Sequence, residues 1–370
     1  MFGHKRVPSR EGGVEVVVEE LCKRMVKRGY DVLIYNRKGH HVSGCAYDVE
    51  KKLDYEGIKI KWVPTIDFRG VAAMTSSLFA ACAAALSNCD IVHIHSEGPA
   101  FMSFIPHLFG KHVIVTVHGL DYQRAKWGKW ARKYILQGEK NAVKYADEII
   151  VLSRNMQQYF LEKYNRNTIY IPNGVGINYA IEPNAILDEF LLKKDDYILY
   201  LGRLVPEKGI KYLIEAYKMC RTEKKLVIAG GASDSDEYAN LLKKSAKSKN
   251  IIFTGFVQGK ILRELYSNAY LYVLPSDLEG MPLSLLEAMS YGNCCITSNI
   301  FECTNVLGDA GVVFEKGNVS DLREQIQRLI DDKPEVERLR LKAKERVRKS
   351  FNWDVVVDDT IELYKKTLEM

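Results

Sequence analysis

Long apolar runs are missing from this sequence. None of its 370 residues lies in a stretch of the ~18–20 uncharged apolar residues that a membrane-spanning helix needs. The nearest candidate, Val71 to Leu86, is alanine-rich, short and interrupted by hydroxyl residues, so we expect a packed helix there. The N-terminus lacks the apolar core of a secretory signal, because Lys5 and Arg6 lead directly to Pro8. We therefore expect a soluble, cytoplasmic protein.

Cysteine motifs are missing as well. The eight cysteines include no C-x-x-C pair, although Cys294 and Cys295 are adjacent. Cys22, Cys82 and Cys220 fall on the apolar faces of predicted helices. This pattern argues against a metal site or a disulfide framework and predicts buried, reduced thiols.

Charge of one sign is not in strong excess. The formal net charge of +6 is compatible with phosphate-bearing ligands or an anionic membrane surface, but it is too small to indicate nucleic acid. A composition of 47% hydrophobic and 27% charged residues is typical of globular proteins and excludes a mostly disordered chain. The length predicts two domains.

Short apolar runs alternate with segments of helical periodicity along most of the chain. This alternation predicts parallel strands joined by crossover helices, and therefore α/β sheets covered on both faces. In the first half we expect strands at 31–35, 91–95, 112–117, 148–152 and 168–171, and helices at 15–28, 124–145 and 154–164. In the second half we expect strands at 197–202, 225–229, 251–254, 271–274 and 294–297, and helices at 209–219, 237–247, 260–268 and 282–291.

A turn-rich segment from Asn173 to Pro183 separates the two runs and predicts a hinge. We expect two doubly wound domains, 1–176 and 177–352, with 353–370 as an amphipathic helix that packs back on the N-terminal domain. Only Met1 and Phe2 precede Gly3, so we expect the first strand of the N-terminal domain to be nearly absent.

The clearest chemical signal lies between Leu274 and Glu287. The letters LPSDLEGMPLSLLE predict a strand, a loop and a helix in that order, with Pro282 in the first helical turn. Ligands of open parallel sheets bind at such strand ends. Glu279 in the loop and Glu287 in the helix can each accept hydrogen bonds from neighbouring sugar hydroxyls, and the helix start offers N–H groups to a phosphate. Two glutamates at this spacing are more often solvated surface residues, but the strand–loop–helix setting favours a site.

A second signal follows another strand of the same half. Arg203 and Lys208 flank a tight turn between Gly202 and Gly209. A guanidinium together with an ammonium suits a diphosphate, whose charge grows as it leaves. Alone, this segment could be an ordinary exposed turn; together with the glutamate segment it indicates a donor site.

These motifs resemble the retaining nucleotide-sugar glycosyltransferases of family 4. The resemblance spans essentially the whole chain, from Arg10 to about Trp353, and implies the GT-B fold: two Rossmann-like doubly wound parallel-sheet domains that face each other across a cleft, with a C-terminal helical tail. The matching segments are G-R-L-x-x-x-K-G at 202–209, E-G-M-P-L-S-L-L-E-A-M at 279–289, Gly12-Gly-Val-Glu15, Thr116-Val-His-Gly-Leu-Asp121 and Ile171-Pro-Asn-Gly174. Gly176 departs from the pattern, because the family commonly has Asp there.

The resemblance also implies roles for individual residues. Arg203 and Lys208 would hold the donor diphosphate, Glu287 the ribose and Glu279 the transferred sugar. His118 would face the reacting sugar. Gly13 from the first domain would meet the phosphates, Phe256 and Val257 would border the base, and Gly231 would permit close approach. The main chain of Gly280, Met281, Pro282 and Leu283 would lie near the transferred sugar.

The implied chemistry is transfer with retention by front-face attack, in which the leaving phosphate helps to remove the acceptor proton. His118 could instead be a general base, a residue that positions the sugar, or a strand-end histidine bound by backbone; the sequence leaves these three open. We expect no cofactor and no metal ion, because the acidic pairs Asp195–Asp196 and Asp234–Asp236 have no histidine or cysteine partners.

The segment after Asp121 mixes aromatic and basic residues. Such a mixture suits a peripheral contact with the cytoplasmic face of an anionic membrane, and many relatives extend glycans on lipid-diphosphate carriers. A core-facing aromatic stripe with a solvated basic face explains the spacing equally well. The residues are Trp127, Trp130 and Tyr134 among Arg124, Lys126, Lys129, Arg132 and Lys133.

The sequence thus predicts a glycosyltransferase that moves a hexose-type sugar from a nucleotide diphosphate donor to a glycan or lipid-linked glycan of the bacterial surface, such as a capsule or exopolysaccharide. One alternative is a nucleotide-sugar epimerase on a similar fold, which needs no acceptor. Another is a non-catalytic scaffold that binds a nucleotide sugar.

Overall fold

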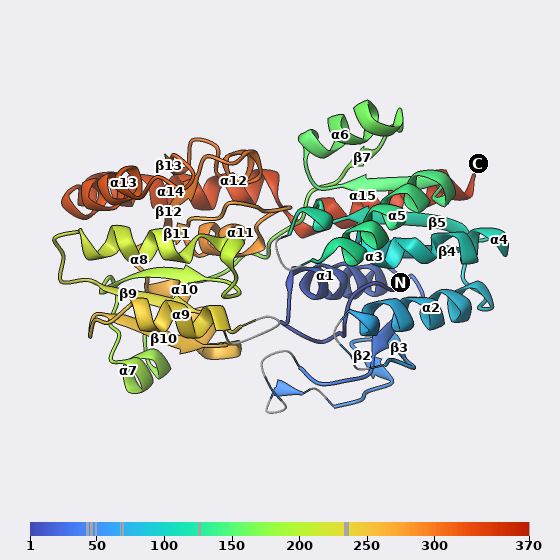
Figure 1. Cartoon of the computed structure of the whole chain (residues 1–370), viewed down its shortest axis with the longest axis horizontal. Helices are drawn as coiled ribbons and strands as arrows, with labels where there is room; N and C mark the ends of the chain where they lie inside the picture. Colours follow the sequence, from blue (N-terminus) through green and yellow to red (C-terminus); the bar gives the residue numbers. More distant parts are fainter. Residues whose placement is uncertain are drawn as a thin grey trace. The chain divides into compact units, whose positions relative to one another are not determined.

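The computed structural model describes residues 1–41, 44, 47–48, 50–66, 68, 70–124, 127–232 and 237–369 (Figure 1). It divides into two compact units. Unit 1 comprises Met1–Gly174 together with Trp353–Met370, and unit 2 comprises Val175–Asn352. The first division therefore follows Gly174, and the last helix belongs to unit 1.

Unit 1 contains two sets of strands. The first set has the order β1-β3-β2 and the second β4-β5-β6-β7. All neighbouring strands are parallel except β2 and β3, which form an antiparallel pair. The strands are β1 (Leu33–Arg37), β2 (Asp54–Tyr55), β3 (Ile58–Val63), β4 (Ile91–His95), β5 (His112–Val117), β6 (Glu148–Val151) and β7 (Ile169–Tyr170).

Met1 and Phe2 lie between these two sets. The amino group of Met1 donates a hydrogen bond to the carbonyl of Leu33, at 2.6 Å. The N–H of Phe2 donates to His93 O at 3.1 Å, and the N–H of His95 donates to Phe2 O at 2.9 Å. Met1 and Phe2 therefore join β1 to β4.

Helices cover this sheet (Figure 1). One apolar cluster combines the buried face of α1 with β1, β3 and the α15 residues Val357 and Ile361. Another combines α2 and α5 with β4, β5 and β6. The helices of unit 1 are α1 (Gly13–Lys27), α2 (Val71–Ala85), α3 (Glu97–Ala100), α4 (Phe104–Leu108), α5 (Lys129–Tyr145), α6 (Arg154–Tyr164) and α15 (Trp353–Leu368).

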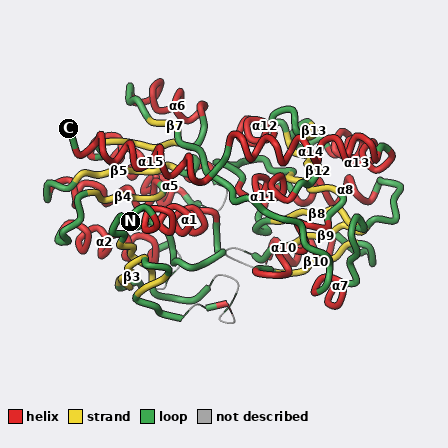
Figure 2. Tube along the Cα trace, turned by 180° about the vertical axis from the view of Figure 1, so that it is seen from behind, coloured by secondary structure: helices red, strands yellow, loops and turns green. Residues whose placement is uncertain are grey.

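Unit 2 is a single six-stranded parallel sheet in the order β10-β9-β8-β11-β12-β13, the order of a doubly wound fold. Figure 2 shows the strands between layers of helices. The strands are β8 (Tyr197–Leu201), β9 (Lys225–Ala229), β10 (Ile251–Gly255), β11 (Leu271–Leu274), β12 (Cys294–Ser298) and β13 (Gly311–Phe314). The helices are α7 (Ala185–Phe190), α8 (Ile210–Lys218), α9 (Glu237–Ser245), α10 (Gly259–Asn268), α11 (Leu283–Tyr291), α12 (Phe301–Leu307), α13 (Val319–Asp331) and α14 (Lys333–Ser350).

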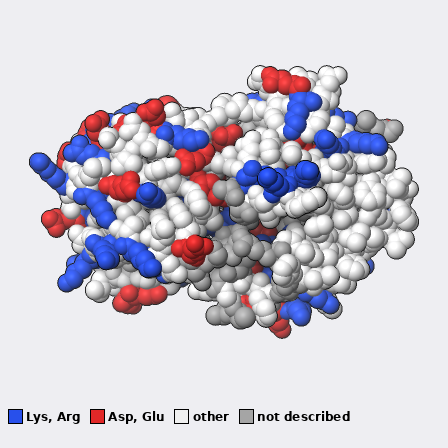
Figure 3. Space-filling view, in the orientation of Figure 1, with Lys and Arg blue, Asp and Glu red and all other residues white. Residues whose placement is uncertain are grey.

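Some expectations about single elements were wrong. The helix expected at 124–145 begins only at Lys129, because Gly128 is its extended N-cap residue and 121–123 form a 3₁₀ turn. Cys82 is exposed rather than buried. The helix between Val71 and Leu86 is present, but it also exposes apolar side chains, and Figure 3 shows few charged residues on this side of unit 1. Exposed large side chains here are Met74, Leu78, Phe79, Leu86, Leu108 and Phe109.

Candidate active site

The donor residues predicted from the sequence lie on loops at one edge of the unit 2 sheet. Strands β8 and β11 are neighbours, although α8, β9, α9, β10 and α10 separate them in sequence. Their carboxyl ends therefore meet at the point where the strand order reverses, which is where open α/β sheets bind ligands. The two loops touch, because the N–H of Asp277 donates to Glu207 O at 2.8 Å.

Lys208 and Glu279 form an ion pair across these loops. Lys208 Nζ lies 2.5 Å from Glu279 Oε1, and the two side chains are only 15% and 8% exposed. Ser276 Oγ donates to the same oxygen at 2.7 Å. Lys208, predicted to bind the diphosphate, and Glu279, predicted to bind the sugar, thus lie side by side. The site is largely desolvated, and electrostatic interactions there are stronger than in water.

The backbone of Arg203 is held by neighbouring strands. The hydroxyl of Tyr200, which is fully buried in β8, donates to Arg203 O at 3.1 Å. The N–H of Leu204 donates to Gly231 O at 2.9 Å. These bonds fix the half-buried Arg203 at the start of the turn and place Gly231 beside it.

Glu287 is the fifth residue of α11 and is held by a residue that no motif included. Tyr266 Oη, from α10, donates to Glu287 Oε2 at 3.2 Å and lies 3.3 Å from Ser284 O. Pro282 is the N-cap residue of α11, with φ −77° and ψ 94°, so it precedes the first helical turn instead of lying within it. Gly280 and Met281 are buried beside it, and Leu283 opens the helix.

Phe256 and Val257 follow β10 and are half-buried. Since β10 is the edge strand next to β9, these residues lie at the same carboxyl edge as Arg203, two strands further along the sheet. Their role beside a base stays a prediction.

The remaining predicted residues belong to unit 1. Gly13 opens α1, and Gly12 is its extended N-cap residue. A Cβ on Gly12 would lie 2.7 Å from Glu15 Oε2. Glu15 is buried and accepts the N–H of Lys5 at 2.8 Å. Burial alone would raise the pKa of Glu15, but the charge and the N–H of Lys5 bring this pKa below its ordinary value.

His118 directly follows β5 and contacts another histidine. Its Nε2 lies 3.1 Å from His95 Nδ1. Burial lowers the pKa of His118 to about 4, although Asp121 and Glu15 act in the opposite direction. The ring is therefore neutral at pH 7. The hydrogen-bond partner that the structure shows for this ring is a side chain, not the backbone that one of the three open alternatives requires.

The aromatic residues after Asp121 do not behave alike. Trp130 is 84% exposed, and Lys133 Nζ lies 5.4 Å from its ring centre. Tyr134 instead stacks on Phe101, with ring centres 4.5 Å apart. The stacking of Tyr134 fits the alternative of a core-facing aromatic residue, and the exposure of Trp130 leaves the membrane contact a prediction. Lys126 lies outside the described residues.

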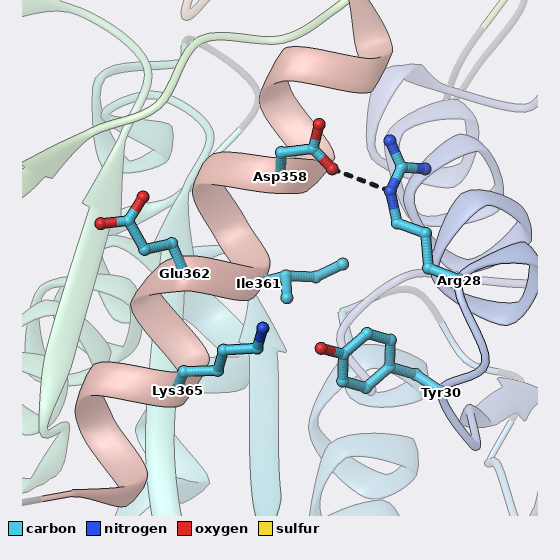
Figure 4. A pocket seen from close by; sticks show the side chains of 6 residues that line it. All are labelled: Arg28, Tyr30, Asp358, Ile361, Glu362 and Lys365. Carbon is cyan, nitrogen blue, oxygen red and sulfur yellow. Dashed lines mark hydrogen bonds and ion pairs between the residues drawn. The ribbon is translucent and has the colours of Figure 1, made fainter.

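A cavity of about 400 Å³ lies elsewhere in unit 1 (Figure 4). Arg28 donates from Nε to Asp358 at its rim, at 2.8 Å. It is near the C-terminal end of α1, roughly 20 Å along the helix from Gly13. Arg28, Tyr30, Asp358, Ile361, Glu362 and Lys365 line it.

The described residues hold neither a metal-binding cluster nor a membrane span. In the ranges that the structure covers, no group of three or more His, Cys, Asp or Glu side chains could hold a metal ion. Asp195 pairs with Arg340 at 2.5 Å, and Asp234–Asp236 lies outside the described residues. No helix of the described chain combines the length and the apolar character needed to cross a bilayer.

Comparison with solved structures shows the fold. Sucrose-phosphate synthase from Thermosynechococcus elongatus superposes with a TM-score of 0.81 at 22% identity, covering 96% of this chain and 93% of that one. HepE from Anabaena, in complex with UDP and glucose, gives a TM-score of 0.82 at 16% identity, covering 99% and 98%.

Comparison of sequences identifies the family. An uncharacterized glycosyltransferase of Methanocaldococcus jannaschii is 24% identical over 98% of this chain and 96% of its own length. O-antigen chain mannosyltransferase B of Escherichia coli is 32% identical, over 49% of this chain and 48% of its own. The model of Glycosyltransferase Family 4 matches residues 11–179, and that of Glycosyl transferases group 1 matches residues 184–346. With two Rossmann-like units that these models match in turn, the chain belongs to the GT-B glycosyltransferases.

Proposed function

We propose that this glycosyltransferase transfers a hexose-type sugar, with retention, from a nucleotide diphosphate sugar to a glycan or a lipid-linked glycan in surface polysaccharide synthesis. The observation that supports the donor class most directly is the desolvated Lys208–Glu279 pair at the carboxyl ends of β8 and β11. Support also comes from the UDP and glucose of HepE and from relatives named for O-antigen and capsular polysaccharide synthesis.

Lys208 and Glu279, together with Arg203, suit a sugar diphosphate in two ways. Lys208 and Arg203 supply positive charge where negative charge develops on the leaving diphosphate, which lowers the barrier to departure. The two donors to Glu279 that the structure shows, Lys208 and Ser276, both use Oε1, so Oε2 is available to sugar hydroxyls. A carboxylate neutralised in this way is a weak nucleophile, which favours front-face attack over a covalent intermediate.

The acceptor side of the proposal concerns unit 1. The exposed Trp130 and the cations Lys129, Arg132 and Lys133, all on the first turns of α5, suit contact with an anionic membrane that holds a lipid-linked acceptor. Equal sedimentation of the unchanged protein and of Trp130→Ser with anionic vesicles would contradict this contact.

The donor assignment is tested by single substitutions in the purified enzyme. We first expect a thermal-shift screen with UDP-, GDP- and dTDP-sugars to identify the stabilising donor. With that donor, Lys208→Ala and Arg203→Ala should each lower kcat by about 10²–10³-fold, as for loss of one preorganised donor to developing charge. Lys211→Ala is the matched control, because Lys211 is exposed on α8 and pairs with Glu215.

Two outcomes would contradict the proposal. Product formation that is unchanged in both Lys208→Ala and Glu279→Ala would remove the site assignment. Rapid interconversion of two nucleotide sugars without any acceptor would instead identify an epimerase.

A further inference from the structure

We propose that His95 is a positioning residue that fixes His118 in the tautomer with its proton on Nδ1, so that His118 offers the substrate a hydrogen-bond donor. This inference rests on the proposed function and on the role that the family resemblance implies for His118, which is to face the reacting sugar. It decides between the roles that the sequence left open for His118.

The two rings meet because of strand register. His95 is the last residue of β4 and lies opposite Thr116 of the parallel strand β5, so His118 is two residues further along. His95 Nδ1 and His118 Nε2 are 3.1 Å apart. His95 is fully buried, and its ring stacks on His93 with ring centres 4.2 Å apart. The position of the His118 ring is therefore set by a rigid neighbour.

Both rings are neutral at pH 7, so each holds one proton. Burial lowers the pKa of His95 well below its ordinary value, and nearby His93 and His118 lower it further. Burial also lowers the pKa of His118 to about 4. A single proton thus lies between Nδ1 of His95 and Nε2 of His118, and either ring could donate it.

The other ring nitrogen of His95, Nε2, decides which of the two histidines donates the hydrogen bond. Its Nε2 is buried and has no hydrogen-bond partner within the described residues. If His118 donated from Nε2, His95 would have to keep its own proton on this Nε2, which would leave a buried N–H without an acceptor. Orphaned buried N–H groups are rarer in proteins than acceptors with unused lone pairs. The favoured arrangement is therefore donation from His95 Nδ1 to His118 Nε2.

This arrangement has a chemical consequence. With its Nε2 lone pair engaged, His118 keeps its proton on Nδ1, and its half-buried ring can donate to a sugar oxygen. It has no lone pair left with which to take the proton of the acceptor hydroxyl. That proton must then leave by another route, such as the departing phosphate.

The tautomer can be observed directly in the full-length protein labelled with ¹⁵N-histidine. Long-range ¹H–¹⁵N correlation spectra distinguish a protonated from an unprotonated ring nitrogen, and the spectrum of His118→Gln assigns the His118 signals. We expect the proton of His118 on Nδ1. A proton on Nε2 would overturn the proposal. Since this measurement needs no substrate, it determines the tautomer even if the proposed donor proves wrong.

Substitutions at His95 add a functional measurement. His95→Asn places an amide donor near the position of Nδ1, whereas His95→Leu removes the donor and keeps the site apolar. We expect His95→Leu to mix the tautomers of His118 and to lower kcat at least about 10-fold, and His95→Asn to restore most of the activity. His112→Asn, at the opposite end of β5, is the control. A His118 spectrum unchanged in a folded His95→Leu variant would overturn the proposal.

Discussion

Single hydroxyl groups hold the two glutamates of the proposed donor site in place. Ser276 donates to Glu279, and Tyr266 donates to Glu287. Tyr266 is only 2% exposed, and its ring stacks on Tyr291 with ring centres 5.4 Å apart. A carboxylate that is oriented before the ligand arrives loses less conformational entropy on binding. We therefore infer that Tyr266 contributes to donor affinity through Glu287.

Replacing Tyr266 by Phe tests this inference. The change keeps the aromatic stack and removes the donor to Glu287, so we expect the KM for the donor sugar to rise roughly 5-fold, equivalent to about 1 kcal/mol for one hydrogen bond, with kcat little changed. Steady-state kinetics would measure KM and kcat separately. The control is Tyr217→Phe, which removes a hydroxyl that donates to Lys224 O at 2.8 Å, just before β9 and far from the carboxyl ends. If both variants keep the original KM, Tyr266 is only a packing residue.

At the scale of elements, the loops that carry Lys208 and Glu279 are held together where their main chains approach closely. Gly209 caps α8 with φ +64°, and a Cβ there would lie 1.9 Å from Pro275 O, in the loop that carries Glu279. Glycine is required for both reasons: the left-handed backbone and the missing side chain. The distance between Lys208 and Glu279 thus depends on a contact between main chains.

We predict that Gly209→Ala displaces the loop after β11 and lowers kcat/KM more than stability alone explains. The matched control is Gly259→Ala, at the start of α10, where φ is +60° but nothing lies within 4 Å of the new Cβ. Both variants should lose about 1–3 kcal/mol of unfolding free energy through backbone strain, measured by urea titration. Only Gly209→Ala should also lose activity. Equal activity in the two variants would show that this close approach does not position the loops.

The sequence predicts elements well where one signal is sufficient. The bounds expected for β4, β5, β9 and β11 agree with the structure, because these strands are buried on both faces and appear as continuous apolar runs. The strand β3 was missed. Its residues alternate between buried and exposed, and lysines occupy the exposed positions.

For the candidate site, too, the sequence predicts single residues better than the contacts between them. The sequence selects Lys208, Glu279 and His118, but not the contacts Lys208–Glu279 or His118–His95. Those contacts follow from strand order, which places β8 beside β11 and β4 beside β5. No local pattern encodes this order. Tyr266 gave no signal for the same reason, since it reaches Glu287 from a different helix.

At the scale of the whole molecule, the histidines are distributed unevenly between the two units. All eight histidines of the sequence belong to unit 1, and unit 2 has none. Burial lowers the pKa of His4 to about 4 and that of His93 to about 3. Burial shifts the pKa values of His95 and His118 in the same direction. Folded unit 1 therefore excludes protons that its unfolded chain would accept.

We predict that mild acid destabilises unit 1 selectively. Above the ordinary histidine pKa of 6.5 both states are neutral, so these groups contribute nothing. As the pH falls from 6.5 towards about 4, only the unfolded chain binds protons, and each buried histidine lowers the unfolding free energy by up to about 1.4 kcal/mol per pH unit. Burial raises the pKa of Glu97 well above 4.5 and also raises the pKa of Asp359, and both shifts oppose the trend. Burial lowers the pKa of a fifth histidine, His41, which adds to it.

Tryptophan fluorescence makes this prediction measurable. The four tryptophans all lie in unit 1, so a urea titration followed by their emission reports on that unit alone. The urea concentration at the midpoint should decrease as the pH is lowered from 7 to 5. Hydrogen exchange within unit 2 should change little over the same range. A midpoint that is independent of pH in this window would contradict the neutral, buried state of these histidines.

The return of α15 to unit 1 also bears on biosynthesis. Because Val357 and Ile361 complete the apolar cluster around α1, the first 174 residues emerge from the ribosome with part of that cluster uncovered. The last piece of unit 1 is synthesised only after all of unit 2. During translation unit 1 therefore keeps an exposed apolar face until α15 is made, whereas unit 2 is able to fold before that. A nascent chain stalled before Trp353 should thus depend on chaperones far more than the released protein does.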